Sequence, residues 1–120
     1  MRVTIPSLPH LLRPGTYPGI LTGLEAREAD GRTFLVWSFE VRARAGTTTV
    51  KATSSASFGP RAKARGWLEA LLRRPLQPGE TIDTEDLLGL PCLLVVGTRE
   101  RDGQAWATIE HVLPAADDDE

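Results

Sequence analysis

The chain has 120 residues, of which 41% are hydrophobic and 25% are charged, so its length favours one domain and its composition excludes wholesale disorder. No apolar run is long enough to span a membrane, and the proline-broken first residues do not match a signal peptide, so we expect a cytoplasmic protein without membrane contact. The net charge of −2 hides an asymmetry, because residues 1–74 contain 12 Lys and Arg against 5 Asp and Glu, whereas residues 75–120 contain 2 against 11. The basic first part makes an anionic partner more plausible, although folding can also mix the two parts into an evenly solvated surface.

The first half of the chain predicts three strands after an N-terminal extension of residues 1–14. Asp30-Gly31 is a strong hairpin signal between strands at 16–29 and 32–44, and the turn at Gly46 precedes the β-branched segment TTTVKATSS. The second strand, RTFLVWSFEVRAR, alternates with period two. One side of it carries Leu35, Trp37, Phe39 and Val41, and the other carries Phe34, Val36, Ser38, Glu40 and Arg42.

A helix follows the third strand. Pro60 suits a first helical turn, and Pro75 ends the segment. The spacing i, i+3, i+4, i+7 predicts one apolar face made of Ala64, Trp67, Leu68 and Leu71. A short helical turn comes next, with Asp83 or Thr84 as its N-cap and Gly89 as its stop.

The last part of the chain predicts two strands and a tail. PCLLVVGT is apolar on both faces and indicates a buried strand, and Asp102-Gly103 marks a second hairpin before the strand AWATIEHVLP. Residues 115–120 form an acidic tail that we expect to be disordered.

The order of these elements predicts a mainly β fold over residues 15–114. Five short strands with one helix between the third and the fourth are the order of an OB-fold, a five-stranded Greek-key barrel. The helix would then close one end of the barrel with Trp67, Leu68 and Leu71. Another small β-barrel or sandwich with one helix is the alternative.

Four segments carry a resemblance to a known family: YPGIL, WSFEV, WLEAL and DLLGLPC. With the residues around them, they resemble small OB-fold proteins of bacteriophages and mobile elements that look like single-stranded-DNA-binding proteins of replication and recombination. The resemblance covers roughly residues 15–114 and rests mostly on scaffold positions. It therefore implies the fold more directly than the function.

An OB-fold binds oligonucleotides across its second and third strands and with the loops before the second and fifth strands. Cations along a groove and aromatic faces are the chemistry that a single strand requires. At those places the sequence supplies the candidate nucleic-acid-binding residues Arg32, Phe34, Arg42, Arg44, Lys51, Arg99 and Arg101, and Lys63 is added because it lies at the start of the helix.

The aromatic residues divide by their neighbours. Trp37 and Phe39 share a side with Leu35 and Val41 and are expected in the core, whereas Phe34 either stacks on a base or is buried under the N-terminal segment or the helix. Trp106 alternates with Thr108 and Glu110, which leaves its exposure open, as for Tyr17.

The sequence gives little support for catalysis or for a cofactor. His10 and His111 lack metal-ligand spacing, and the single cysteine, Cys92, is expected to be a buried and inert thiol. The carboxylates Asp83, Glu85 and Asp86 are explained by the start of a helical turn rather than by a metal site.

We therefore predict a non-enzymatic single-stranded-DNA-binding protein of phage or mobile-element replication or recombination. The alternative is a protein-interaction or assembly module of a replication or recombination complex that uses the same barrel. The sequence leaves open whether RNA can replace DNA, whether replication or recombination proteins bind, and whether the chain forms homo-oligomers. The acidic tail either competes with nucleic acid for the basic surface or only improves solubility.

Overall fold

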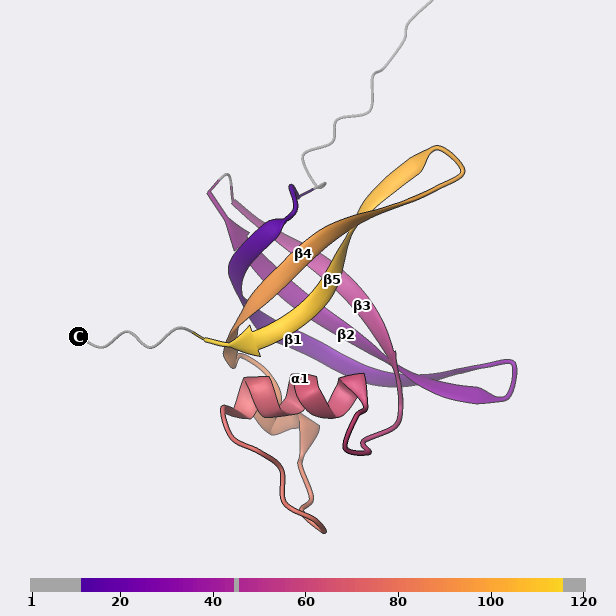
Figure 1. Cartoon of the computed structure of the whole chain (residues 1–120), viewed down its shortest axis with the longest axis vertical. Helices are drawn as coiled ribbons and strands as arrows, with labels where there is room; N and C mark the ends of the chain where they lie inside the picture. Colours follow the sequence, from indigo (N-terminus) through magenta and orange to yellow (C-terminus); the bar gives the residue numbers. More distant parts are fainter. Residues whose placement is uncertain (1–11, 45, 116–120) are drawn as a thin grey trace, which may run out of the picture.

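The computed structural model describes residues 12–44 and 46–115, and its elements follow the predicted order (Figure 1). They are β1 (Gly15–Ala29), β2 (Arg32–Ala43), β3 (Gly46–Ser55), α1 (Lys63–Leu72), the 3₁₀ helix η1 (Thr84–Leu87), β4 (Pro91–Arg101) and β5 (Gln104–Pro114). The predicted mainly β fold, with five strands and one α-helix, is confirmed. His10 and residues 116–120 of the acidic tail lie outside the described residues.

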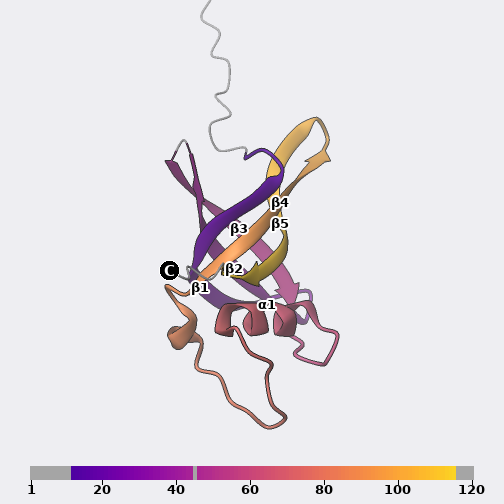
Figure 2. The ribbon, with the colours of Figure 1, turned by 60° about the vertical axis from the view of Figure 1, so that its left-hand side comes forward.

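The five strands form one antiparallel sheet with the order β3-β2-β1-β4-β5. The sheet curves until its two edge strands, β3 and β5, contact each other, but within the described chain no hydrogen-bonded ladder joins them (Figure 1). The sheet is thus not closed into a barrel, and the OB-fold stays a prediction. α1 lies across one end of the curved sheet (Figure 2).

β1 holds the two halves of the sheet together. It pairs with β4 over Gly15–Ile20 and with β2 over Gly19–Ala29, and the register shifts at a bulge between Leu21 and Gly23. Where both partners meet, a Cβ atom on Gly19 would lie 2.6 Å from the carbonyl oxygen of Glu40 and 2.5 Å from Leu94 Cδ1. Only glycine fits this approach without a shift of the neighbouring backbone.

The two predicted hairpin turns are confirmed. Asp30 and Gly31 have φ angles of 52° and 74°, and Asp102 and Gly103 have φ angles of 53° and 80°. Positive φ at both central residues is the requirement of a type I′ turn, which matches the twist of the flanking strands. The turn chemistry therefore fixes where β2 and β5 begin.

α1 begins later than predicted. Residues 59–62 form a turn in which Ala62 N–H donates to the Gly59 carbonyl at 3.0 Å, so Pro60 lies in this turn and not in the first turn of the helix. The helix ends at Leu72 because Arg73 adopts a left-handed conformation with φ of 61° and donates its N–H to the Glu69 carbonyl. This end lies before Pro75, as the sequence predicts.

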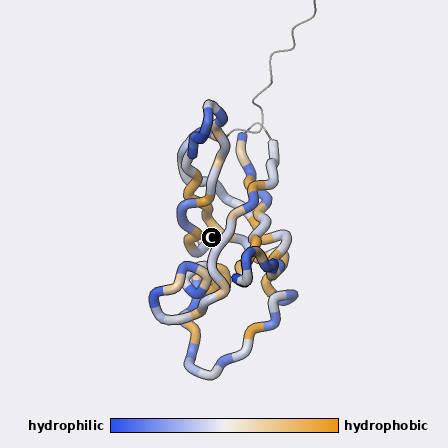
Figure 3. The backbone as a smooth tube through the Cα atoms, turned by 90° about the vertical axis from the view of Figure 1, so that its right-hand side faces the viewer, coloured by the Kyte–Doolittle hydropathy of each residue, from blue (hydrophilic) through white to orange (hydrophobic). Residues whose placement is uncertain are grey.

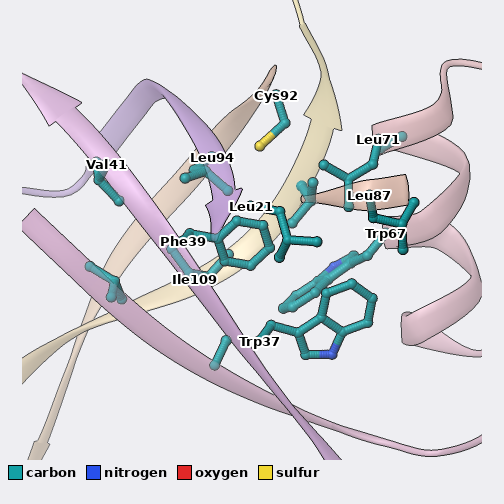
Figure 4. Close-up of a cluster of buried hydrophobic side chains, with 14 of the residues drawn as sticks. Leu21, Trp37, Phe39, Val41, Trp67, Leu71, Leu87, Cys92, Leu94 and Ile109 are labelled. Carbon is teal, nitrogen blue, oxygen red and sulfur yellow. The ribbon is translucent and has the colours of Figure 1, made fainter. Parts of the chain in front are cut away.

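The core confirms the inward side of the β2 alternation, whereas Val36 of the outward side is also buried but lies outside the core cluster. Leu35, Trp37, Phe39 and Val41 are buried, and they belong to one core cluster with Ala64, Trp67, Leu68 and Leu71 of α1. Figure 4 shows Trp67 and Leu71 on the helix side of this cluster. The Trp67 ring meets Trp37 and Phe39 edge-on, with ring centroids 5.2 and 5.8 Å apart. Trp37 Nε1 donates to Ser54 Oγ at 2.9 Å, which satisfies the buried indole N–H. Trp37 and Phe39 are therefore core residues.

Two segments outside the main strands also enter the core. Leu12, in the predicted extension, is buried, and Leu87 of η1 is fully buried. η1 is capped as predicted, since Asp83 Oδ1 accepts from Glu85 N–H at 3.0 Å. Leu87 thereby anchors the long α1–β4 connection to the body of the sheet.

Candidate nucleic-acid interface

The outer face of the β1–β2–β3 half carries four of the predicted residues: Arg32, Phe34, Arg42 and Lys51. The ladder places Phe34 between Arg27 of β1 and Ser55 of β3, Lys51 opposite Ser38, and Arg42 opposite Thr47. Directly paired residues point to the same face of a sheet, and this face is opposite the core side chains of β2. Phe34, Lys51 and Arg42 therefore share one surface.

Charges of both signs lie on this surface. Arg27 forms an ion pair with Glu25, and Arg42 Nε lies 3.5 Å from Glu40 Oε1. Lys51 is exposed and has no ion-pair partner among the described residues. The middle of the face thus offers one uncompensated cation beside polar Thr and Ser side chains, rather than a continuous basic groove.

Phe34 is half-buried, and it does not belong to the group of side chains that pack on the described core. It therefore sits on the outer face with part of its ring accessible. A base could therefore stack on the accessible part of the Phe34 ring, whereas the rings of Trp37 and Phe39 are fully buried and cannot be reached by a base.

The predicted residues of β2 lie at its two ends. Arg32 and Phe34 are near the β1–β2 hairpin, whereas Arg42 and Arg44 are about 33 Å farther along, at the β2–β3 hairpin, at a rise of about 3.3 Å per residue. Arg42 also lines a hollow of about 440 Å³ between β1, the start of β4 and Arg73, which follows α1. The structure does not bring all eight predicted residues into one cluster.

The β4–β5 hairpin carries an aromatic and cationic group. In its ladder Arg99 is paired with Trp106 and Arg101 with Gln104, so these four side chains point to one face of the hairpin. Trp106 is 44% exposed, and both arginines are exposed. We name Arg99, Arg101 and Trp106 the hairpin platform; it lies on the hydrophilic hairpin at the top of the molecule (Figure 3).

Two hairpins face the same side of the molecule. In Figure 1 the β1–β2 and β4–β5 hairpins both extend to the right, with β3 and β5 between them, while the β2–β3 hairpin lies on the left. Arg32 and the hairpin platform thus flank the side where the two sheet edges meet. Arg42 and Arg44 belong to the opposite side.

Lys63, the first residue of α1, is engaged with the protein itself. Its Nζ lies 4.8 Å from the centroid of the Trp67 ring and donates to the Thr53 carbonyl at 3.4 Å. A cation over an aromatic face gains about 0.5–1 kcal/mol at an exposed site. Lys63 therefore attaches the start of α1 to the edge of β3. Because its ammonium group already has partners within the protein, it is the weakest candidate among the predicted nucleic-acid-binding residues.

Trp106 is the residue that sequence reasoning left undecided and the structure exposes. The sequence pattern that indicated this exposure was the alternation of Trp106 with the polar residues Thr108 and Glu110. Trp106 and Thr108 stand on the outer face of β5, whereas Ala107 packs against the core and Ile109 is buried in it.

The described residues offer few groups for other chemistry. Within residues 12–44 and 46–115, no three His, Cys, Asp or Glu side chains are placed to hold a metal ion. Cys92 is buried, and burial raises the pKa of its thiol to about 12, so it stays protonated at neutral pH. In the same part of the chain, no helix combines the length and the apolar character that crossing a membrane demands.

No protein-family model matches the chain, and a search of curated proteins finds no match.

Proposed function

We propose that this protein is a non-enzymatic binder of single-stranded DNA, built on an OB-type fold and acting in phage or mobile-element replication or recombination. The hairpin platform stacks bases, and the exposed cations hold the phosphates. The biological setting rests on the family resemblance. The binding itself is argued from the described side chains.

The strand order supports the OB-type fold. The order β3-β2-β1-β4-β5, with β3 and β5 in contact, is what a five-stranded Greek-key barrel gives when it is open between its third and fifth strands. β1 takes part in both halves, and α1 packs across one end. In this fold the β2–β3 face and the β1–β2 and β4–β5 loops bind oligonucleotides.

The observation that carries the proposal is the hairpin platform. Trp106 is 44% exposed on a charged hairpin, and Arg99 stands directly opposite it at a Cβ separation of about 5 Å. A base can stack on the indole while Arg99 and Arg101 meet the adjacent phosphates. Such stacking contributes about 1–3 kcal/mol per base and tolerates any base.

The charges set the expected salt dependence. Four of the predicted residues on or beside the proposed path are exposed cations without a carboxylate partner among the described residues: Arg32, Lys51, Arg99 and Arg101. For single strands each phosphate contact contributes about −0.7 to the slope of log K against log salt, so four contacts give about −3.

The test is fluorescence anisotropy with a labelled dT oligomer at several salt concentrations, beside an rU oligomer and a duplex of equal length. We expect binding to dT with a slope near −3 and weaker binding to the duplex, whose bases are not free to stack. Arg99→Ala should lower affinity and slope, whereas Arg61→Ala, a matched control at the turn before α1, should change neither. The proposal is wrong if dT does not bind even at low salt.

A protein partner is the second candidate function. It is favoured by two hollows beside η1, whose lining includes apolar Leu24 and Leu88 and acidic Glu85.

A further inference from the structure

Two hollows adjoin where the α1–β4 connection crosses β1. One, of about 370 Å³, lies between β1, Ser38 of β2 and η1, and the other, of about 340 Å³, lies between α1, Phe58 and residues 76–84. Leu24 and Thr84 line both. The two hollows are therefore adjacent, and we name them together the η1 groove.

The groove exposes apolar surface. Phe58 is 46% exposed and Leu88 is 47% exposed, and these are two of the four large hydrophobic side chains that the described chain leaves open. Half-buried Leu24, Leu76 and Ile82 form its floor and continue into the core. Apolar side chains that gather around a concave site indicate a binding surface more strongly than scattered ones do.

The charge of the groove is negative. Glu25, Glu80 and Glu85 line it, and among the described residues no lysine or arginine does. Glu25 and Glu80 are compensated by Arg27 and Arg74, whereas Glu85 is exposed without a partner in the described chain. This negative charge repels phosphate and attracts a cation. The groove therefore favours a different kind of ligand from the cationic hairpin platform.

The walls of the groove are held in place. Gly89 N–H donates to the Leu21 carbonyl at 2.7 Å, and Leu21 N–H donates to the Leu90 carbonyl at 3.3 Å, so η1 is attached to β1 at its C-terminal end. On the other wall, Glu80 Oε1 accepts from Gln77 N–H at 2.9 Å. A preformed site loses little conformational entropy when a ligand binds.

We propose that the η1 groove binds a peptide segment of a partner protein in which an apolar side chain is flanked by lysine or arginine. The apolar side chain enters beside Phe58 and Leu24, and a flanking cation meets Glu85. The groove ends at Ser38, which is paired with Lys51, so the partner would lie next to the face proposed for nucleic acid. The inference does not depend on nucleic-acid binding.

The test is a selection from a library of random displayed 12-residue peptides on the immobilised full chain, followed by anisotropy with the selected peptides made synthetically. We expect the selected peptides to combine an apolar residue with Lys or Arg. Glu85→Lys and Phe58→Ser should each weaken their binding at least tenfold. Glu100→Lys on the β4–β5 hairpin and Leu113→Ser at the end of β5 are matched controls that should retain it.

Two results would overturn the proposal. One is the absence of any enriched peptide, and the other is equal binding by Glu85→Lys and Glu100→Lys, which would place the peptides elsewhere, including on the acidic tail. Circular dichroism verifies that Phe58→Ser remains folded. If Phe58→Ser does not fold, the comparison of Glu85→Lys with Glu100→Lys still tests the proposal. Binding of dT, measured in parallel, should be retained by Glu85→Lys, so failure of the groove and failure of the hairpin platform are distinguishable.

Discussion

Replacement of Trp106 with alanine separates binding from folding. Trp106 is outside the core cluster and 44% exposed, so its removal loses mainly a cross-strand contact with Arg99, worth less than about 1 kcal/mol of folding free energy. If a base stacks on the indole, the same change removes about 1–3 kcal/mol of binding free energy. Because about 1.4 kcal/mol is a factor of ten, the dissociation constant should rise about 5-fold to 150-fold.

Trp67 provides the matched comparison. It is 4% exposed and lies edge-on against Trp37 and Phe39. Trp67→Ala should therefore cost about 3–5 kcal/mol of stability, while the affinity of the fraction that remains folded should hardly change. The two tryptophan variants are expected to show opposite patterns.

The assay is anisotropy with a labelled dT oligomer of about 15 nucleotides, near the upper end of the site sizes of OB-folds, together with thermal unfolding followed by circular dichroism. A Trp106→Ala protein that melts like the wild type and binds dT with the same dissociation constant would refute the hairpin platform. Trp106→Phe, which keeps an aromatic face, should recover part of the affinity.

Three further predictions follow from single contacts. Lys51→Ala should reduce the salt slope of dT binding by about 0.7 without changing the melting temperature, and an unchanged slope would exclude Lys51 from the interface. Ser54→Ala leaves the buried Trp37 Nε1–H without its acceptor and should lower the unfolding free energy by about 1–3 kcal/mol in urea titrations; a change below about 0.5 kcal/mol would show that another acceptor replaces it. The Arg74 guanidinium lowers the pKa of Glu80 from 4.5 to about 2, so this carboxylate stabilises the fold above pH 4.5 and the contribution is lost as the pH falls toward 2. Melting curves of Glu80→Gln should thus approach those of the wild type at low pH, and a constant difference at all pH values would contradict this.

Local patterns in the sequence determined the elements of this protein. The alternation of β2 identified its core residues correctly because successive residues of a strand point to opposite faces whatever the strand pairs with, whereas the burial of Val36 on the other face does not follow from it. The two Asp-Gly pairs located the hairpins because a type I′ turn needs positive φ at both central positions. The apolar spacing of α1 identified the face that packs on Trp37 and Phe39.

The tertiary structure decided what those local patterns leave open. The separation of Arg42 and Arg44 from the hairpin platform depends on how the hairpins are oriented, and the partners of Arg42 and Lys63 depend on which side chains approach them. Trp106 is exposed because no other segment of the described chain covers it. The η1 groove forms because segments that are distant in the sequence lie next to each other. Burial and local charge are sums over such neighbours, and a strand's own periodicity contains no information about what covers its outer face.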